Sequence, residues 1–360
     1  MEDFKFKNAK IVPENLVAHN VRKKPFQIYG LYRPEEEGVF KRIPLDVAER
    51  TSKNVRTLCT NTTGARVRFK TDSSYIAVGA IYPPMEFPSP CSTALAATGA
   101  YSFDLYADGK FCRVLYPKDI EQNGSINNFV IRDGQYEGAY DFGSKRIREI
   151  TLNFPSFVDI SDVYIGLKDG SVLEEGMPYK NEKPVVFYGS SITHGACASR
   201  PGNIYENILS RRMNMDYLNL GFSGSAKAEK EIIEYIASLE MSVFVFDYDH
   251  NARNPEFLKE THYPALEIFR EAQPDTPIVL LSRPNQSCGI KEAEERIAII
   301  KESQQKLLAQ GDEKVHFING QDIFLSHDSE MMTMDDTHPT DLGFYCMAEV
   351  IEKVLRLYIS

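Results

Sequence analysis

The chain contains no tryptophan, no CxxC pair, no cluster of basic residues and no long apolar run. A membrane-spanning helix needs roughly 20 apolar residues, so we expect no transmembrane segment. The N-terminus also lacks a basic patch followed by an apolar run, which favours a cytoplasmic location unless a leader has been trimmed away. The net charge of -10, with the basic residues scattered, argues against nucleic acid as the main partner.

Cysteine is present but is too sparse and too widely spaced for a disulfide scaffold or a zinc site. We therefore expect reduced and mostly buried thiols. The six cysteines are Cys59, Cys91, Cys112, Cys197, Cys288 and Cys346. With 42% hydrophobic and 26% charged residues, the composition is that of an ordinary folded protein.

The first half of the chain has a period-two pattern. Short runs such as ARVRFKT and SFDLYAD alternate with clusters of Gly, Pro, Asn, Asp and Ser between about residues 25 and 179. This pattern is typical of an antiparallel β-sandwich. Within ARVRFKT, Val67 and Phe69 would point inward and their three basic neighbours outward. We predict an N-terminal, jelly-roll-like domain over residues 1–180.

The second half alternates continuous apolar strands with amphipathic helical segments. The strands are PVVFYG, DYLNLG, SVFVFDY, PIVLLSR and VHFING. They predict a flavodoxin-like, three-layer α/β/α domain over residues 181–360, with a parallel five-stranded sheet covered on both faces. Ligands of such sheets bind at the carboxyl ends of the strands, near a topological switch point. Candidate functional residues are therefore those that directly follow each strand.

Three strand ends carry small or polar residues. After the first strand, Gly189 permits a tight turn, and Ser191 could be a nucleophile or the turn could simply hold an N-capping serine. It is not a GxSxG elbow, because Ile192-Thr193 stands in place of the second glycine. After the second strand, Gly224 lies in a turn where a backbone N–H could approach a substrate oxygen. After the third, Asn251 could donate to an oxyanion or merely cap a turn.

A fourth candidate segment precedes the last helix. Asp335 and His338 are three residues apart, close enough for the carboxylate to hold the imidazole while its other nitrogen faces a serine. Asp336 is the rival orienting acid.

Taken in order, these segments resemble the four conserved blocks of the SGNH (GDSL-like) hydrolase superfamily. The matching residues are Gly189-Ser190-Ser191-Ile192-Thr193, Gly224, Asn251 and Asp335-x-x-His338-Pro339, within roughly residues 183–358. Gly99-Ala100-Tyr101-Ser102-Phe103-Asp104-Leu105-Tyr106 resembles the GxDLY signature of the β-sandwich that precedes such hydrolases in a bacterial branch. In two places the sequence departs from the pattern: Ser190 replaces the aspartate of GDS, and Asp247-Tyr248-Asp249-His250-Asn251 replaces GxND.

The resemblance implies a serine esterase that needs no metal or cofactor. It assigns Ser191 as nucleophile, His338 as base and Asp335 as the acid that orients the base. The oxyanion would be held by the backbone N–H groups of Ser191 and Gly224 and by the side chain of Asn251.

Several neighbouring residues are weaker candidates. Asn254 is the alternative to Asn251 in the oxyanion hole. Possible substrate-binding residues are His194, Arg200, His250 and Arg283, whose alternative interpretation is polar loop residues without a chemical role.

A β-sandwich beside such a hydrolase resembles the arrangement in carbohydrate esterases. We therefore expect a small acyl ester, most simply an acetylated sugar, as substrate and no membrane partner. Two alternatives stay open: a broader esterase or lysophospholipase acting on longer acyl chains, and a non-catalytic carbohydrate-binding protein. The sequence does not predict the oligomeric state.

Overall fold

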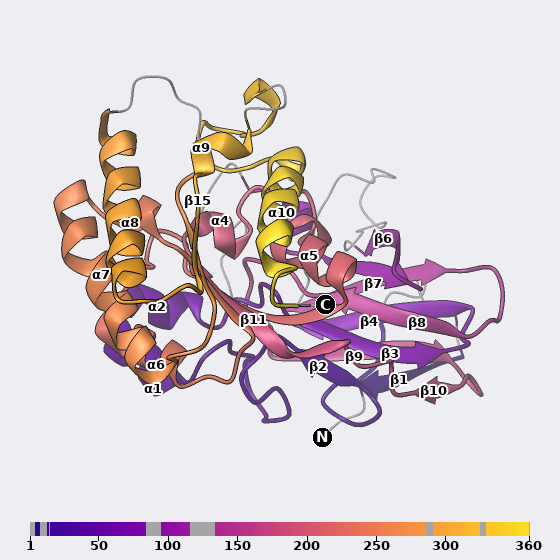
Figure 1. Ribbon diagram of the computed structural model, residues 1–360. Helices are drawn as coiled ribbons and strands as arrows, with labels where there is room; N and C mark the ends of the chain where they lie inside the picture. The colour runs from indigo at the N-terminus through magenta and orange to yellow at the C-terminus, as the bar shows by residue number, and fades with distance from the viewer. Residues whose placement is uncertain are drawn as a thin grey trace. The chain divides into compact units, whose positions relative to one another are not determined.

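The computed structural model describes residues 4–7, 13, 15–83, 95–115, 134–284, 291–324 and 329–359 (Figure 1). The chain groups into two compact units. The first comprises Met1–Lys41, Thr60–Pro178 and Ser199–Gly202, and the second comprises Arg42–Cys59, Tyr179–Ala198 and Asn203–Ser360. No single cut in the chain therefore separates the two units: residues 42–59 belong to the second unit, and residues 199–202 belong to the first. The division into domains 1–180 and 181–360 stays a prediction.

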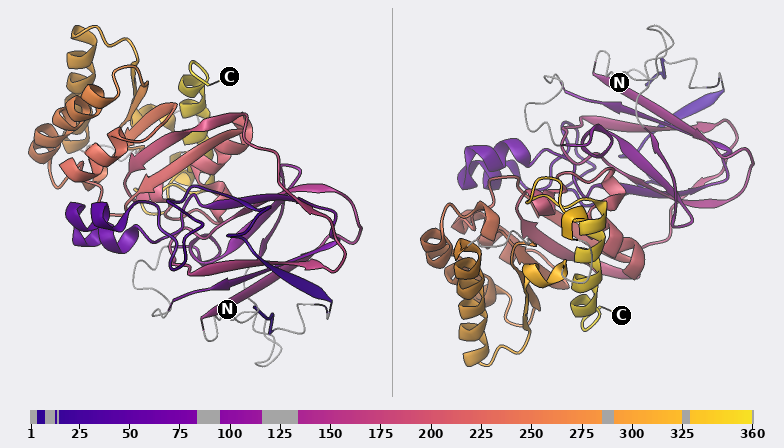
Figure 2. Two further views of the ribbon diagram at one scale, coloured as in Figure 1. Left: turned by 90° about the horizontal axis from the view of Figure 1, so that it is seen from below. Right: turned by 90° about the horizontal axis from the view of Figure 1, so that it is seen from above.

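The first unit contains two antiparallel sheets, as the period-two pattern predicts (Figure 2). One sheet has the strand order β1-β9-β4-β7, and the other has the order β10-β3-β8-β5-β6 with β2 paired to β3. The elements are β1 (Leu16–Asn20), β2 (Gln27–Tyr29), β3 (Arg66–Thr71), β4 (Tyr75–Ile81), α3 (Ala97–Ala100), β5 (Phe103–Ala107), β6 (Lys110–Leu115), β7 (Gln135–Asp141), β8 (Arg148–Asn153), β9 (Asp162–Lys168) and β10 (Leu173–Glu174).

Strand β3 shows how far the alternation holds. Val67 and Phe69 are fully buried, which confirms their predicted inward orientation. Arg66 is 1% exposed, so the expectation that all three basic neighbours face water is wrong. Its guanidinium donates to the Gly64 carbonyl oxygen at 2.8 Å and lies over the ring of Tyr29, which compensates for the loss of solvent.

The second unit is built on a five-stranded parallel sheet with the order β12-β11-β13-β14-β15. This is the flavodoxin-like order, and the predicted fold class is confirmed. The strands are β11 (Asn181–Gly189), β12 (Met215–Gly221), β13 (Val243–Asp247), β14 (Ile278–Leu281) and β15 (Val315–Ile318).

Helices cover both faces of this sheet because its strands are apolar on both sides (Figure 1). Val186 and Tyr188 of β11 pack in the core under α1, α2, α6, α7 and α8, and Val185 and Phe187 pack in the core under α5 and α10. The helices are α1 (Leu45–Thr51), α2 (Lys53–Leu58), α4 (Ser191–His194), α5 (Tyr205–Met213), α6 (Lys230–Ala237), α7 (Pro255–Ala272), α8 (Lys291–Ala309), α9 (Gly320–Ile323) and α10 (Asp341–Leu355), with 3₁₀ turns η1 (Pro201–Asn203), η2 (Asp249–Asn251) and η3 (Ser329–Met331).

The sequence pattern does not predict α1 and α2, which come from the first half of the chain but belong to the second unit. Arg42, three residues before α1, is 2% exposed. Its guanidinium donates to the carbonyl oxygens of Asn219 and Gly221 in β12 and of Leu58, each at 2.8 Å. These bonds attach the N-terminal segment to the carboxyl end of β12.

The described cysteines form no disulfide: Cys59 and Cys346 are buried, and Cys112 and Cys197 are half-buried. Cys91 and Cys288 lie outside the described residues. Among the residues that the structure covers, no helix combines the length and apolar character needed to cross a membrane.

Candidate active site

The strand order places a topological switch point at the carboxyl ends of β11 and its two neighbours. The chain runs from β11 to β12 on one side and then crosses to β13 on the other. Gly189 at the end of β11 is in register with Gly221 of β12 and with Asp247 of β13. The loops that bear Ser191, Gly224 and Asn251 therefore start side by side, as expected for a ligand site.

The turn after β11 gives its two serines different positions. Ser190 is the N-cap of α4, and its Oγ accepts a hydrogen bond from the Ile192 N–H at 3.2 Å. Ser191 is the first residue of the helix. A side chain at Gly189 would collide with Thr193 Oγ1 and the Asp247 carbonyl oxygen, so the tight turn requires glycine. The N-capping alternative thus applies to Ser190.

Ser191, His338 and Asp335 form a hydrogen-bonded chain. Ser191 Oγ lies 2.9 Å from His338 Nε2, and His338 Nδ1 lies 2.8 Å from Asp335 Oδ2. A carboxylate can only accept hydrogen bonds, so Nδ1 carries the ring proton and Nε2 is left to accept from the serine hydroxyl. This is the tautomer that a histidine base requires.

Asp335 is held in its ionised form by local hydrogen bonds. Its Oδ1 accepts from the Thr337 N–H at 3.1 Å and from the His338 N–H at 2.8 Å. Partial burial opposes ionisation, but the hydrogen bonds from His338 and Thr337 outweigh it and lower the pKa of Asp335. Asp336, the rival acid, has a left-handed backbone with φ of 65°, and its carbonyl oxygen accepts a hydrogen bond from Arg283.

Asn251, the third oxyanion candidate, is hydrogen-bonded to the turn that bears Gly224. Asn251 Nδ2 donates to the Phe222 carbonyl oxygen at 3.2 Å, in the turn that leads to Gly224. Gly224 has a φ of 67°, a conformation that side chains other than glycine rarely adopt. Asn254 is exposed, and its Oδ1 caps α7 by accepting from the Phe257 N–H at 2.9 Å. The structure thus places Asn251 at the turn and gives Asn254 a capping role.

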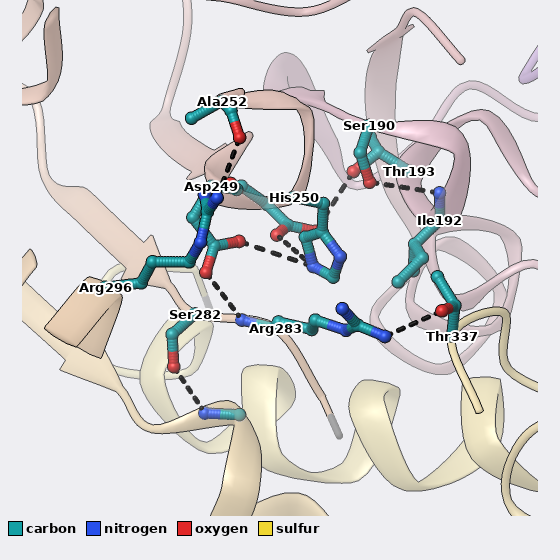
Figure 3. A network of polar contacts seen from close by, with 12 residues as sticks. Ser190, Ile192, Thr193, Asp249, His250, Ala252, Ser282, Arg283, Arg296 and Thr337 are labelled. Atoms are coloured by element: carbon teal, nitrogen blue, oxygen red, sulfur yellow. Dashed lines mark hydrogen bonds and ion pairs between the residues drawn. The ribbon is translucent and has the colours of Figure 1, made fainter. Parts of the chain in front are cut away.

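The four possible substrate-binding residues lie in different surroundings. His194 is fully buried, and its Nδ1 accepts from the Ser223 N–H at 3.4 Å. His250 follows β13 with a side chain only 6% exposed. Arg283 Nη2 donates to the Asp336 carbonyl oxygen at 2.9 Å and to Thr337 Oγ1 at 2.6 Å (Figure 3). Arg283 therefore holds the loop that carries the candidate base.

Arg200 belongs to the first unit. Its Nη1 lies 3.0 Å from Asp104 Oδ2, and its guanidinium lies 3.9 Å from the centre of the Phe111 ring. The Gly202 N–H donates to the same carboxylate oxygen at 2.8 Å. The aspartate of the GxDLY-like signature thus binds a segment that follows the nucleophile in sequence.

Two buried acids at the end of β13 were given no role by sequence reasoning. Burial raises the pKa of Asp247 well above its usual value, and the nearby charge of Asp249 adds to this effect. Burial likewise raises the pKa of Asp249 to about 6. With His250 they form a group that could hold a metal ion. Acidic residues directly after a buried strand were the available signal.

Comparisons with known proteins cover both halves of the chain. Residues 182–356 match the GDSL-like lipase/acylhydrolase family, and residues 17–173 match the GxDLY family, described as the N-terminus of SGNH-hydrolase-type esterases. A search of the curated proteins gave no match.

Among solved structures, one described as a GDSL-like lipase from Bacteroides ovatus is 27% identical, with a TM-score of 0.80 over 95% of this chain and 98% of that chain. The salicylyl-acyltransferase SsfX3 of a tetracycline biosynthetic pathway is 18% identical, with a TM-score of 0.74 over 96% of this chain and 98% of that chain. The acetyl xylan esterase Est2A of Butyrivibrio proteoclasticus is 12% identical, with a TM-score of 0.60 over 95% of this chain and 98% of that chain.

The family matches agree with the parallel sheet and with the antiparallel sheets that precede it in sequence. The two matched segments leave no large part of the chain unassigned. Residues 182–356 therefore belong to the GDSL-like lipase/acylhydrolase family of carboxylic ester hydrolases, and residues 17–173 form the GxDLY-type segment that precedes the hydrolase in sequence.

Proposed function

We propose that the protein hydrolyses small acyl esters through an acyl-enzyme on Ser191. His338 Nε2 takes the hydroxyl proton as Ser191 Oγ attacks the ester carbonyl carbon, and the imidazolium then gives this proton to the departing alcohol. Water, deprotonated by the same imidazole, next attacks the acyl-serine and releases the carboxylic acid. Asp335 keeps the proton on Nδ1 and stabilises the imidazolium in both steps.

The observation that carries this proposal is the Ser191–His338–Asp335 chain, with contacts of 2.9 and 2.8 Å and an acid whose pKa is lowered. The negative oxygen of the tetrahedral intermediate would accept from the N–H groups of Ser191 and Gly224 and from Asn251 Nδ2. Loss of one such donor typically costs about 3 to 4 kcal/mol of transition-state stabilisation. The link from Asn251 to the turn before Gly224 supports placing these donors together.

We propose an acetylated sugar as the substrate. Similar structures include an acetyl xylan esterase and family two carbohydrate esterases from Clostridium thermocellum and Cellvibrio japonicus. Their identities of 10 to 15% establish only a shared fold, and their substrates suggest which esters to assay. The presence of a second, antiparallel unit in this chain is consistent with that choice.

The test is acetate release from acetylated mono- and oligosaccharides, measured beside nitrophenyl acetate, butyrate and octanoate. Wild type is compared with Ser191→Ala and with the matched control Ser238→Ala. Ser238 ends α6 before the amino end of β13, away from the carboxyl edge of the sheet. We expect acetyl-sugar hydrolysis in wild type and in the control, and at least about a 10³-fold loss in Ser191→Ala.

The other outcomes separate the alternatives. A preference for octanoate would keep the mechanism and replace the sugar assignment with a lysophospholipase-like activity. Sugar binding without Ser191-dependent hydrolysis of any ester would support a non-catalytic carbohydrate-binding protein. Faster acyl transfer to an added alcohol than to water would indicate a transferase.

A further inference from the structure

The turn after β13 contains three buried side chains, each with a polar atom that lacks a hydrogen-bond partner. These atoms are Asp247 Oδ1, Asp249 Oδ1 and His250 Nε2, and the second ring nitrogen of His250 also lacks one. The side chains of both acids are at most 3% exposed, and that of His250 is 6% exposed. His250 Nε2 faces the two carboxylate oxygens as an ion pair would, but no hydrogen bond joins these atoms. A buried polar atom without a hydrogen bond typically costs about 1 to 3 kcal/mol, so a further polar partner, an ion or a water molecule, is expected among them.

The three atoms are spaced as metal ligands are. His250 Nε2 lies 3.3 Å from Asp249 Oδ1 and 4.0 Å from Asp247 Oδ1. One possible ligand atom from each of the three residues lies within 4.8 Å of the other two. Ligands about 2.0 to 2.2 Å from a tetrahedral zinc ion lie roughly 3.3 to 3.6 Å apart. Small side-chain movements would therefore bring all three into coordination.

The opposite atom of each carboxylate is already engaged, which fixes its orientation. Asp247 Oδ2 accepts from Thr193 Oγ1 at 3.2 Å, and Asp249 Oδ2 accepts from the Arg283 N–H at 3.2 Å. Functional metal sites commonly have ligands oriented by such outer contacts. When a cation displaces their protons, the two carboxylates carry two negative charges beside a neutral imidazole, which match a divalent ion.

We propose that Asp247, Asp249 and His250 form a structural binding site for a divalent transition-metal ion of the zinc or manganese class. Two carboxylate oxygens and one imidazole nitrogen leave room for a water molecule in a fourth position. The ion takes no part in bond making. The proposal does not depend on the proposed esterase activity or on the identity of the substrate.

The neighbouring arginines do not occupy this site. Arg296 is paired with Glu292 at 2.5 Å and donates to the carbonyl oxygens of Asp249 and Ala252. The Arg283 guanidinium points to Thr337 (Figure 3). In the contacts of the described residues, neither guanidinium reaches a carboxylate oxygen of Asp247 or Asp249.

The position of the site connects it to both ends of the candidate catalytic chain. Through Asp247 it contacts Thr193, two residues after Ser191. Through Asp249 it contacts Arg283, whose guanidinium holds the loop that ends at His338. Figure 3 shows His250 between the Ser190–Thr193 turn and Arg283. A bound ion would thus stiffen the two loops whose separation sets the serine–histidine distance.

The experiment uses the full chain without a histidine tag, stripped with chelator and then incubated with one equivalent of Zn²⁺, Mn²⁺ or Co²⁺. Metal content after gel filtration, the thermal unfolding midpoint and the visible spectrum of the Co²⁺ form are measured. We expect one ion per chain, a rise of a few degrees in the midpoint, and a Co²⁺ band typical of mixed nitrogen and oxygen ligands.

Asp249→Asn and His250→Asn test the assignment, with His316→Asn on β15 as the matched control. The first two should weaken binding by about 100-fold or more, and the control should bind as wild type does. The side-chain amide oxygen that Asp249→Asn introduces can still accept from the Arg283 N–H, which favours a folded variant. The proposal is overturned if wild type binds no ion at micromolar concentration, or if the variants and wild type bind equally. The Co²⁺ spectrum tests wild type even if a variant fails to fold.

Discussion

His262 should make the stability of the second unit depend on pH. This residue of α7 is 2% exposed, and its ring lies 5.1 Å from Phe246 and 5.8 Å from Tyr248, centre to centre. Its Nδ1 lies 2.9 Å from Ser303 Oγ. Burial lowers the pKa of His262 from 6.5 to about 3, because the charged ring would lose its hydration.

The sign follows from which state binds the proton. Between the unfolded pKa of 6.5 and the folded pKa of about 3, the unfolded chain takes up a proton at this site and the folded chain does not. The stabilisation is therefore complete above the unfolded pKa and is lost as the pH falls through this window. Linkage gives a loss of about 2 kcal/mol in unfolding free energy between about pH 7 and about pH 5.

Urea unfolding of wild type and His262→Phe at both pH values isolates this contribution. The apolar variant should lack about 2 kcal/mol of the pH-dependent loss seen in wild type, whatever its stability at neutral pH. Ser303→Ala is the matched control, since it removes the hydrogen-bond partner but keeps the imidazole and hence the pH dependence. An identical pH dependence in wild type and His262→Phe would refute the reasoning.

Three further predictions concern catalysis and the first unit. Asp335→Asn should lower kcat on nitrophenyl acetate by about 10²- to 10⁴-fold with little change in KM, and Asp336→Asn should not; equal effects would show that the acid is misassigned. Asn251→Ala should lower kcat by about 10²- to 10³-fold, and a wild-type kcat would remove Asn251 from the oxyanion hole. Gly202→Ala should destabilise the protein by about 1 to 3 kcal/mol in chemical unfolding, because the added Cβ would collide with Tyr106 Oη. An unchanged unfolding midpoint would contradict this, since the neighbouring side chains would then have moved aside at little cost.

Sequence reasoning predicts the sheet and its loops because these depend on local patterns. Five apolar runs separated by helical segments specify a parallel sheet, and the residues after each run must meet at one edge. The Ser191–His338 contact could be expected for this reason, although its 2.9 Å distance could not. The choice of Asp335 over Asp336 depends on a left-handed residue inside the turn, which no periodicity reveals.

The features that sequence reasoning missed depend on distant partners. Helices α1 and α2 pack in a core to which strands and helices more than a hundred residues later contribute most of the side chains. From the sequence, Arg200 is expected in a loop beside the active site, but the structure groups it with strands of the first unit. The cluster of Asp247, Asp249 and His250 becomes visible only when buried atoms without partners are located.

Because residues 42–59 belong to the second unit, they affect how the chain folds during synthesis and where it can be cut into fragments. During synthesis, the segment that carries Arg42 leaves the ribosome long before β12, and must wait for the strand whose carbonyl groups it will bind. A hydrolase fragment expressed from residue 181 onward would lack that guanidinium and leave the apolar surface under α1 and α2 uncovered. The two family matches are therefore separable in a sequence comparison, but we expect that cutting the chain between them would not give two independently folding pieces.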